Sequence, residues 1–211
     1  MSGNDSSKSL LERAYDVQAP DQAQALYRDW AASYEQDMVQ PLGYVGPARI
    51  AEIAAQASGN QNHHVLDVGC GTGLVGQQLH RLGFNALDGL DFSQAMLEQA
   101  HKKGIYQSLI QADLNAPLNV RSESYDLLVS CGTFTHGHVG PNAFDELLRI
   151  TRTGGLLCLS INAAIYESDG FAAKLRAWDE VGKISVRSAE KVTLVAEENI
   201  DGLVALFVKQ S

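Results

Sequence analysis

Cysteine is scarce in this chain, and its spacing excludes the usual disulfide frameworks. The three cysteines, Cys70, Cys131 and Cys158, form no C-x-x-C pair. An odd and sparse set of this kind favours a reducing compartment, so we expect a soluble, cytoplasmic protein. The polar start MSGNDSSKS lacks the apolar core of a signal peptide, and no run of about 18 apolar residues predicts a membrane span.

Positive charge is also scarce. The chain has 16 lysines and arginines against 25 aspartates and glutamates, which gives a formal net charge of −9. Phosphate backbones are bound by basic surfaces, so this balance disfavours a nucleic-acid partner. A membrane partner is not expected either, because long apolar runs are missing.

The length of 211 residues predicts a single folded domain. We expect a flexible tail over residues 1–20 and one domain over residues 21–211. The pattern QAQALYRDWAASYEQDM predicts one helix from Gln22 to Met38, and a second helix is expected over Pro47–Ala57. We interpret residues 21–58 as a helical lid.

The remaining residues, 63–211, are expected to form an α/β core. Five apolar segments alternate with helical patterns, namely HVLDVG, ALDGLD, YQSLIQAD, YDLLVSC and GLLCLSI. Residues 113–124 are the exception and predict mainly loop, while a helix near 171–181 precedes two further strand-like runs. This order predicts a Rossmann-like three-layer α/β/α sandwich, with a mostly parallel seven-stranded sheet that ends in a C-terminal antiparallel hairpin.

Glycines follow the first of these apolar segments at every second position. In VLDVGCGTGLVG, residues 65–76, Gly69 and Gly71 would let a ligand approach the main chain without a Cβ in the way. The same stretch satisfies G-x-G-x-x-G, the pattern of dinucleotide-binding turns. The glycines therefore predict a nucleotide site and leave open which nucleotide it takes.

Three acidic residues near the ends of consecutive strands narrow that choice. Asp91 could accept hydrogen bonds from ribose hydroxyls in either kind of nucleotide. Asp67, inside the first strand, would repel a pyrophosphate but attract a sulfonium or ammonium group. Asp113 could accept the exocyclic amine of adenine. Together the acids favour a cationic adenosyl ligand over a dinucleotide.

The same segments resemble the class I S-adenosylmethionine-dependent methyltransferases. VLDVGCGTG looks like the first motif of that family, GLDFSQAMLEQA like its second-strand motif, QADL like its adenine-binding motif and YDLLVSCGTF like its fourth-strand motif. TRTGGLLCLS is similar to the family's turn into strand five. LYRDWAASYEQD narrows the resemblance to the subgroup around the Williams–Beuren syndrome region methyltransferase-like protein. The implied cofactor is S-adenosyl-L-methionine, with S-adenosyl-L-homocysteine as product.

Carried over to this chain, the resemblance implies a set of cofactor contacts. The residues concerned are Tyr27, Trp30, Tyr34, Asp67, Gly69, Cys70, Gly71, Asp91, Phe92, Met96, Asp113, Leu114, Ser130 and Cys131. Asp67 would orient the amino group, Asp91 would hold the ribose and Asp113 the adenine edge, while the aromatic stripe of the N-terminal helix would close over the cofactor. Packing against the sheet is the alternative role for the aromatic and aliphatic members. Both cysteines are interpreted as small buried hydrophobes rather than nucleophiles.

Methyl transfer by in-line displacement requires the protein to align the acceptor and to exclude water. A general base is required only where the acceptor is protonated and weakly acidic. His136 and Tyr34 are the candidate catalytic residues, His138 shares the loop with His136, and no metal site is expected. The small size of the domain favours a small molecule as the methyl acceptor, and a protein acceptor remains open. The sequence does not determine the oligomeric state. An NAD(P)-linked oxidoreductase and a non-catalytic adenosyl-cofactor-binding protein remain alternative interpretations.

Overall fold

The computed structural model describes residue 13, residues 20–135 and residues 139–211, so most of the predicted tail and His136 and His138 lie outside the described residues. One seven-stranded sheet has the order β3-β2-β1-β4-β5-β7-β6. Its strands are β1 Val65–Val68, β2 Leu87–Asp91, β3 Ser108–Gln111, β4 Tyr125–Phe134, β5 Thr151–Asn162, β6 Ile184–Val195 and β7 Ile200–Lys209. β1 to β5 are parallel, and β7 pairs antiparallel with β5 and β6. The predicted sheet and its terminal hairpin are confirmed.

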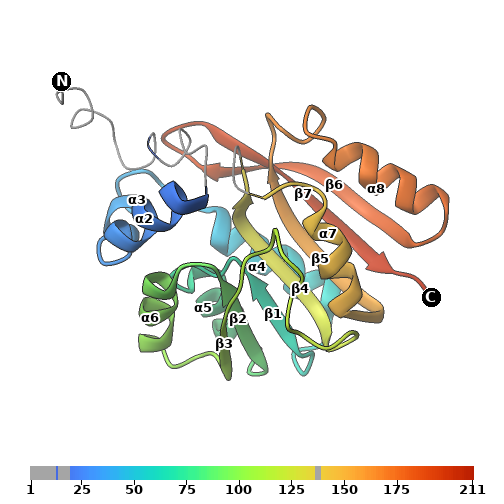
Figure 1. Cartoon of the computed structure of the whole chain (residues 1–211), viewed down its shortest axis with the longest axis horizontal. Coiled ribbons are helices and arrows are strands. Elements are labelled where there is room, and N and C mark those ends of the chain that lie inside the picture. Colours follow the sequence, from blue (N-terminus) through green and yellow to red (C-terminus); the bar gives the residue numbers. More distant parts are fainter. Residues whose placement is uncertain (1–12, 14–19, 136–138) are drawn as a thin grey trace.

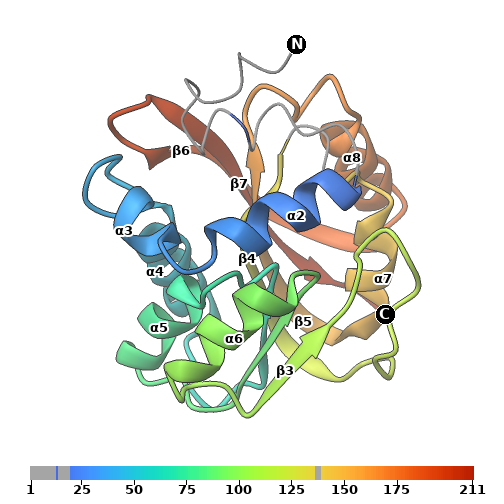
Figure 2. The ribbon, with the colours of Figure 1, turned by 60° about the vertical axis from the view of Figure 1, so that its left-hand side comes forward.

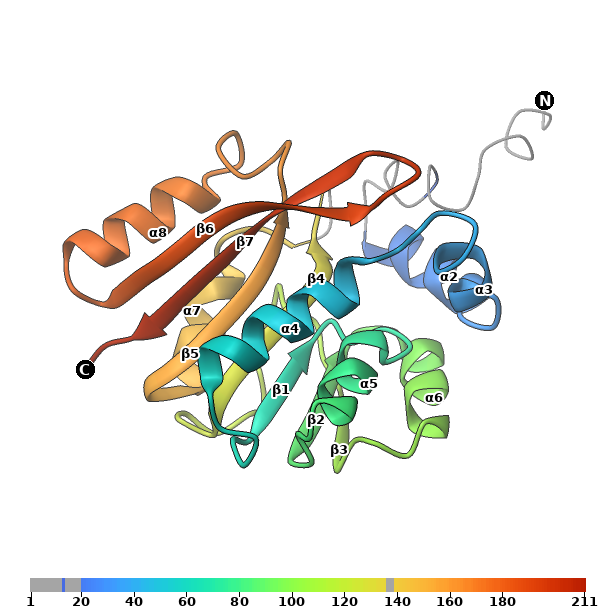
Figure 3. The ribbon, with the colours of Figure 1, turned by 180° about the vertical axis from the view of Figure 1, so that it is seen from behind.

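Helices cover both faces of the sheet and complete the three predicted layers. α4 (Gly46–Ser58) and α5 (Leu74–Arg81) pack on one face, while α7 (Ala143–Ile150) and α8 (Phe171–Glu180) cover the other (Figure 1 and Figure 3). α6 (Gln94–Lys102) packs against β2 and β3. Among the described helices, none combines the length and the apolar character needed to cross a membrane.

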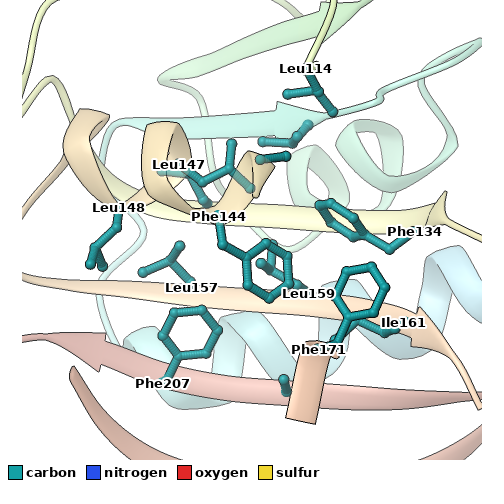
Figure 4. Close-up of a cluster of buried hydrophobic side chains, with 14 of the residues drawn as sticks. Leu114, Phe134, Phe144, Leu147, Leu148, Leu157, Leu159, Ile161, Phe171 and Phe207 are labelled. Atoms are coloured by element: carbon teal, nitrogen blue, oxygen red, sulfur yellow. The ribbon is translucent and has the colours of Figure 1, made fainter. Parts of the chain in front are cut away.

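Each face of the sheet has its own hydrophobic core. On the side of α7 and α8, four phenylalanines gather around β4, β5 and β7, namely Phe134, Phe144, Phe171 and Phe207 (Figure 4). The ring centroids of Phe134 and Phe144 lie 5.0 Å apart in an edge-to-face arrangement, a favourable geometry for aromatic pairs. The opposite core joins α4 and α5 to the N-terminal helices. A sheet held on both faces is a firm base for a site at its strand ends.

The predicted single helix from Gln22 to Met38 is wrong at its centre, because the structure has two helices, α2 (Pro20–Trp30) and α3 (Tyr34–Met38). At the break, the Ser33 backbone N–H donates to the Trp30 carbonyl oxygen at 3.0 Å, three residues back, where the α-helical pattern reaches four back. The Asp37 carboxylate joins the two helices, because its Oδ2 atom accepts hydrogen bonds from Trp30 Nε1 and Ser33 Oγ, both at 2.8 Å. α2 then lies across the end of the sheet where the parallel strands finish (Figure 2).

β5 and β6 both begin well before the apolar runs that predict them. β5 includes the TRTGG segment, which forms an irregularity between the Tyr125–Thr151 and Leu127–Leu156 pairs. β6 begins at Ile184, well before the predicted KVTLVAEE run. Its first half is mostly exposed and polar, as is common for a strand at a sheet edge. Pairing with β7, rather than an apolar pattern, therefore determines where β6 begins.

Candidate functional site

A cavity opens at the carboxyl ends of the parallel strands. Such a place at the strand ends is where open α/β sheets bind their ligands. The lining includes most of the predicted contact residues, namely Tyr27, Tyr34, Gly69, Gly71, Asp91, Phe92, Met96, Asp113, Leu114 and Cys131. The topology thus brings five separate sequence segments to one hollow.

The glycine turn after β1 forms one wall of this cavity. Gly69 and Gly71 both have left-handed backbone angles, with φ of +65° and +53°. A Cβ atom on Gly69 would lie 2.1 Å from Thr133 Oγ1, whereas a Cβ on Gly71 would meet nothing within 4 Å. Gly69 is therefore required for packing against β4, and Gly71 leaves backbone open to a ligand.

Asp91, the last residue of β2, is fastened to this turn. Its Oδ2 accepts from the backbone N–H of Gly71 at 2.8 Å, and its Oδ1 accepts from that of Ser93 at 2.9 Å. Its burial raises the pKa of the carboxyl group, and the backbone N–H donors oppose that rise. A carboxylate has about four lone-pair positions, so two bonds leave capacity for ligand hydroxyls.

Apolar side chains line much of the cavity beyond the ends of β2 and β3. Leu114 and Met96 are buried there, and both line the cavity together with Phe92. The Phe92 ring meets that of Tyr27 edge to face, with centroids 5.9 Å apart. Asp113 is exposed, and its Oδ1 accepts from the backbone and side-chain nitrogens of Asn115. This end can take a planar ring with a polar edge.

Both N-terminal helices close the cavity from the other side. Tyr27 of α2 and Tyr34 of α3 line it, and Glu35 ties α3 to the glycine turn. Glu35 Oε1 accepts from Thr72 Oγ1 at 2.6 Å and lies 2.6 Å from Lys103 Nζ. These contacts hold α3 directly above the turn.

Four of the predicted contact residues do not line the cavity. Trp30 is 2% exposed, packs within the core and lines a second, neighbouring cavity. Ser130 is buried and donates to the Val68 carbonyl oxygen at 2.8 Å, which joins β4 to β1. Cys70 turns its sulphur toward Gly89 of β2. The fourth residue, Asp67, lies beneath the turn.

Asp67 forms a small buried network of its own. Its Oδ2 accepts from the Gly76 backbone N–H at 3.0 Å and from the Tyr106 hydroxyl at 2.7 Å. Burial raises the pKa of Asp67 to about 7, against the lowering effect of those two donors. In this protein the carboxyl group therefore fixes the start of α5 to β1 and Tyr106.

The hydroxyl and thiol groups at the inner end of the cavity are poor bases. Burial raises the pKa of Tyr34 and Tyr44 above the ordinary tyrosine value, and it raises the pKa of the Cys131 thiol to about 12. The Tyr44 hydroxyl lies 3.4 Å from Cys131 Sγ. All three groups are protonated near neutral pH, so Tyr34 can position an acceptor but not deprotonate it. His136, the other catalytic candidate, lies outside the described residues.

The sequence analysis missed several residues of the lining, namely Leu90, Ala112, Asn115, Gly132, Thr133 and Val139. Gly132 and Thr133 extend β4 beyond the apolar run that predicts the strand. Their position in the CGTF segment, directly after two predicted contact residues, is the signal that could have identified them. Across the described residues, no group of three His, Cys, Asp or Glu side chains is arranged to hold a metal ion.

Comparison with known proteins supports the resemblance seen in the motifs. Residues 66–159 match the family described as a methyltransferase domain. Human methyltransferase-like protein 27 is 41% identical over 146 residues, which are 67% of this chain and 59% of the human protein. The ubiquinone biosynthesis O-methyltransferase of Pectobacterium atrosepticum is 26% identical over 120 residues, 55% of this chain and 49% of that protein. The chain therefore spans about half to three fifths of the length of these relatives.

Solved structures share the fold over most of the chain. The S-adenosylmethionine-dependent methyltransferase of Mesorhizobium loti aligns with a TM-score of 0.56 and 20% identity, over 74% of this chain and 97% of that protein. The [4+2]-cyclase SpnF aligns with a TM-score of 0.68 and 14% identity, over 92% of this chain and 97% of that protein. Identities this low establish the Rossmann-like fold alone, and the cyclase shows that this fold also carries another reaction.

Proposed function

Because residues 66–159 match a methyltransferase domain and the chain resembles a methyltransferase-like protein, we propose that it is a class I, S-adenosylmethionine-dependent methyltransferase. The cofactor of this family is S-adenosyl-L-methionine. The acceptor we propose is a small molecule, and the reaction is an in-line displacement that leaves S-adenosyl-L-homocysteine. We place this activity in one domain over residues 21–211. The three free, buried cysteines support the cytoplasm as its location.

One observation carries the proposal: the open glycine backbone, the buried Asp91 carboxylate and a group of apolar side chains line one cavity. This set fits the methionine, ribose and adenine parts of the cofactor. Gly69 and Gly71 would hold the methionine part through the main chain, and Asp91 would accept from the ribose hydroxyls. Asp113, Leu114, Phe92 and Met96 would hold the adenine end. The buried network of Asp67 fits a bracing role beneath the turn, without direct contact.

The cofactor supplies a methyl group on a positively charged sulphur, so the protein must align the acceptor and exclude water. Tyr27 and Tyr34 cover the cavity, with α3 tied down by Glu35. Cys131 and Gly132 would lie near the reacting end, where the described side chains carry hydroxyl and thiol groups rather than charges. These residues would hold the acceptor oxygen, nitrogen or sulphur in place by hydrogen bonding and contact.

Two features favour a small-molecule acceptor over a protein. The inner end of the site is covered by α2 and α3, which would hinder a folded protein surface (Figure 2). Bacterial relatives include ubiquinone biosynthesis O-methyltransferases, which makes an oxygen acceptor the first chemistry to test here.

Calorimetry tests the cofactor. We expect S-adenosyl-L-methionine and S-adenosyl-L-homocysteine to bind with micromolar dissociation constants, about 7–8 kcal/mol. NAD and NADP should bind at least tenfold more weakly. The reverse preference would replace the proposal by the alternative of an NAD(P)-linked oxidoreductase.

Labelled cofactor then tests the reaction. Incubation with methyl-labelled S-adenosyl-L-methionine and a metabolite extract should yield labelled products by mass spectrometry, in equal amount with S-adenosyl-L-homocysteine. Tight cofactor binding with no labelled product from small-molecule or protein fractions would favour a non-catalytic binder. A mass change without the label would indicate a different reaction on the same fold.

A further inference from the structure

A second cavity adjoins the proposed cofactor site. It lies between the N-terminal helices, the ends of β4 and β5, and the turn of the β6–β7 hairpin. Tyr27, Tyr34 and Gly132 line both cavities. The second cavity therefore begins where the proposed reacting end of the first one finishes.

Gly132 lies at the boundary between the two cavities and places no side chain of its own there. Its φ of +77° is a backbone conformation that glycine adopts most readily. A Cβ atom there would lie 2.8 Å from the Tyr44 hydroxyl. The Gly132 backbone N–H donates to Ser160 Oγ at 3.1 Å, which fixes β4 to β5 at this point. The backbone of Gly132 is thus fixed at this boundary.

Uncharged residues make up the described lining of the second cavity, from Trp30 and Met38 on the helices to Leu194 and Ile200 on the hairpin. Its polar groups are hydroxyls and one amide, including those of Ser160 and Asn162. A carboxylate, phosphate or ammonium group placed there would lose hydration without gaining an opposite charge. That loss costs several kcal/mol per ion, so the lining selects against ionised ligands.

Aromatic rings give one wall of this cavity a defined shape. The rings of Trp30 and Tyr34 meet edge to face, with centroids 4.8 Å apart, and Tyr27 stacks on Trp30 at 6.3 Å. The indole N–H of Trp30 is already donated to Asp37, so this part of the wall is apolar toward a ligand. A flat, apolar ring matches such a wall better than a flexible polar chain.

We propose that the second cavity binds the methyl acceptor, and that this acceptor is an uncharged, ring-bearing small molecule. The inference rests on the proposed methyltransferase function and specifies the substrate class of the same site. Gly132 marks the point at which the nucleophilic atom of the ring substituent reaches the methyl group. Phosphorylated, carboxylated and cationic molecules are excluded by the lining.

Matched probes test this inference in the presence of saturating S-adenosyl-L-homocysteine. 2-Naphthol and indole represent neutral rings, and 6-hydroxy-2-naphthoate and indole-5-carboxylate are their ionised counterparts. We expect ligand-observed NMR to show that each neutral ring binds at least tenfold more tightly than its carboxylate. Equal affinities, or a preference for the carboxylates, would overturn the proposal.

Ile200 locates the binding, because it lines the second cavity and not the first. Ile200→Trp should weaken 2-naphthol binding at least tenfold and leave the affinity for S-adenosyl-L-homocysteine within twofold. Ile200→Lys should shift the preference toward 6-hydroxy-2-naphthoate. Val181→Trp, at a position that is 76% exposed, is the control and should change neither affinity.

The outcomes separate the two proposals. Unchanged 2-naphthol binding in a folded Ile200→Trp variant would overturn the acceptor site while the methyltransferase function stands. Failure of the unaltered protein to bind S-adenosyl-L-homocysteine would instead overturn the proposed function, and the acceptor site with it.

Discussion

At the scale of single residues, Asp91 combines a structural role with the proposed ribose contact. Its side chain is 6% exposed and accepts two backbone N–H groups, so it is part of the fold as well as the site. Asp91→Asn should weaken S-adenosyl-L-homocysteine binding at least tenfold, which is about 1.4 kcal/mol. It should also reduce the free energy of unfolding by ~1–3 kcal/mol, because one backbone donor loses its acceptor.

Asp113→Asn is the control for that change. Asp113 is exposed, so its replacement should alter stability by less than about 1 kcal/mol while weakening the proposed adenine contact. Calorimetry and urea denaturation of both variants give the two quantities separately. Unchanged cofactor affinity in a folded Asp91→Asn protein would remove Asp91 from the site.

Asp67 predicts a pH dependence of stability. Its pKa is about 7 in the folded protein, against ~3.9 in an unfolded chain. Between those values the folded state binds more protons, so this group makes the free energy of unfolding fall as pH rises from about 4 to about 7. Below about pH 4 its stabilising contribution is fully present, and above about pH 7 the group no longer changes stability with pH.

Asp67→Asn should remove that slope, since an amide does not titrate in this range. The measurement is urea denaturation of both proteins between pH 5 and pH 8, and the difference between them isolates Asp67 from other titrating groups. Parallel curves for the two proteins would show that Asp67 has an ordinary pKa in the folded state.

At the scale of elements, α2 and α3 are the two helices that cover the cavity. A hydrogen bond from Thr72 to Glu35 joins α3 to the glycine turn. We predict that these helices are more open without ligand and are held in place by the cofactor, as covering elements of enzyme sites often are. Amide hydrogen exchange over residues 22–38 should slow when S-adenosyl-L-homocysteine is added. Exchange in α8, far from the cavity, serves as the internal reference and should not change.

The burial of Trp30 determines how that prediction can be tested by mutation. Trp30→Ala should reduce the free energy of unfolding by ~3–5 kcal/mol, because a large buried side chain is removed. Trp30→Phe keeps most of the packing and removes the N–H donated to Asp37, so it is the better probe of helix opening. Equal exchange protection over residues 22–38 with and without ligand would make α2 and α3 a fixed part of the core.

At the scale of the whole molecule, cofactor binding should stabilise the folded state. A ligand at a hundred times its dissociation constant adds about 2.7 kcal/mol. For a chain of this size that corresponds to a rise in Tm of about 5–11 °C. NAD at the same concentration should change Tm by less than about 2 °C, and equal shifts from both ligands would contradict the assignment of the cofactor site.

Local patterns in the sequence predicted the order and type of nearly all the strands and helices. Apolar period, helix caps and the glycine turn act over a few residues, so β1 to β5, the loop at residues 113–124 and the terminal hairpin could be identified without a structure. The approach of Gly71, Asp91 and Asp113 to one cavity was predictable for the same reason, because the carboxyl ends of parallel strands meet at one edge of a sheet.

Only the tertiary structure decided the features that depend on contacts between distant segments. Asp67 meets Tyr106, 39 residues further along, and this contact draws it away from the cavity. The long β6 exists through pairing with β7. The boundary at Gly132 depends on Tyr44 and Ser160, which come from other elements. A local sequence pattern carries no record of such partners, because side-chain direction and burial are determined when the segments pack together.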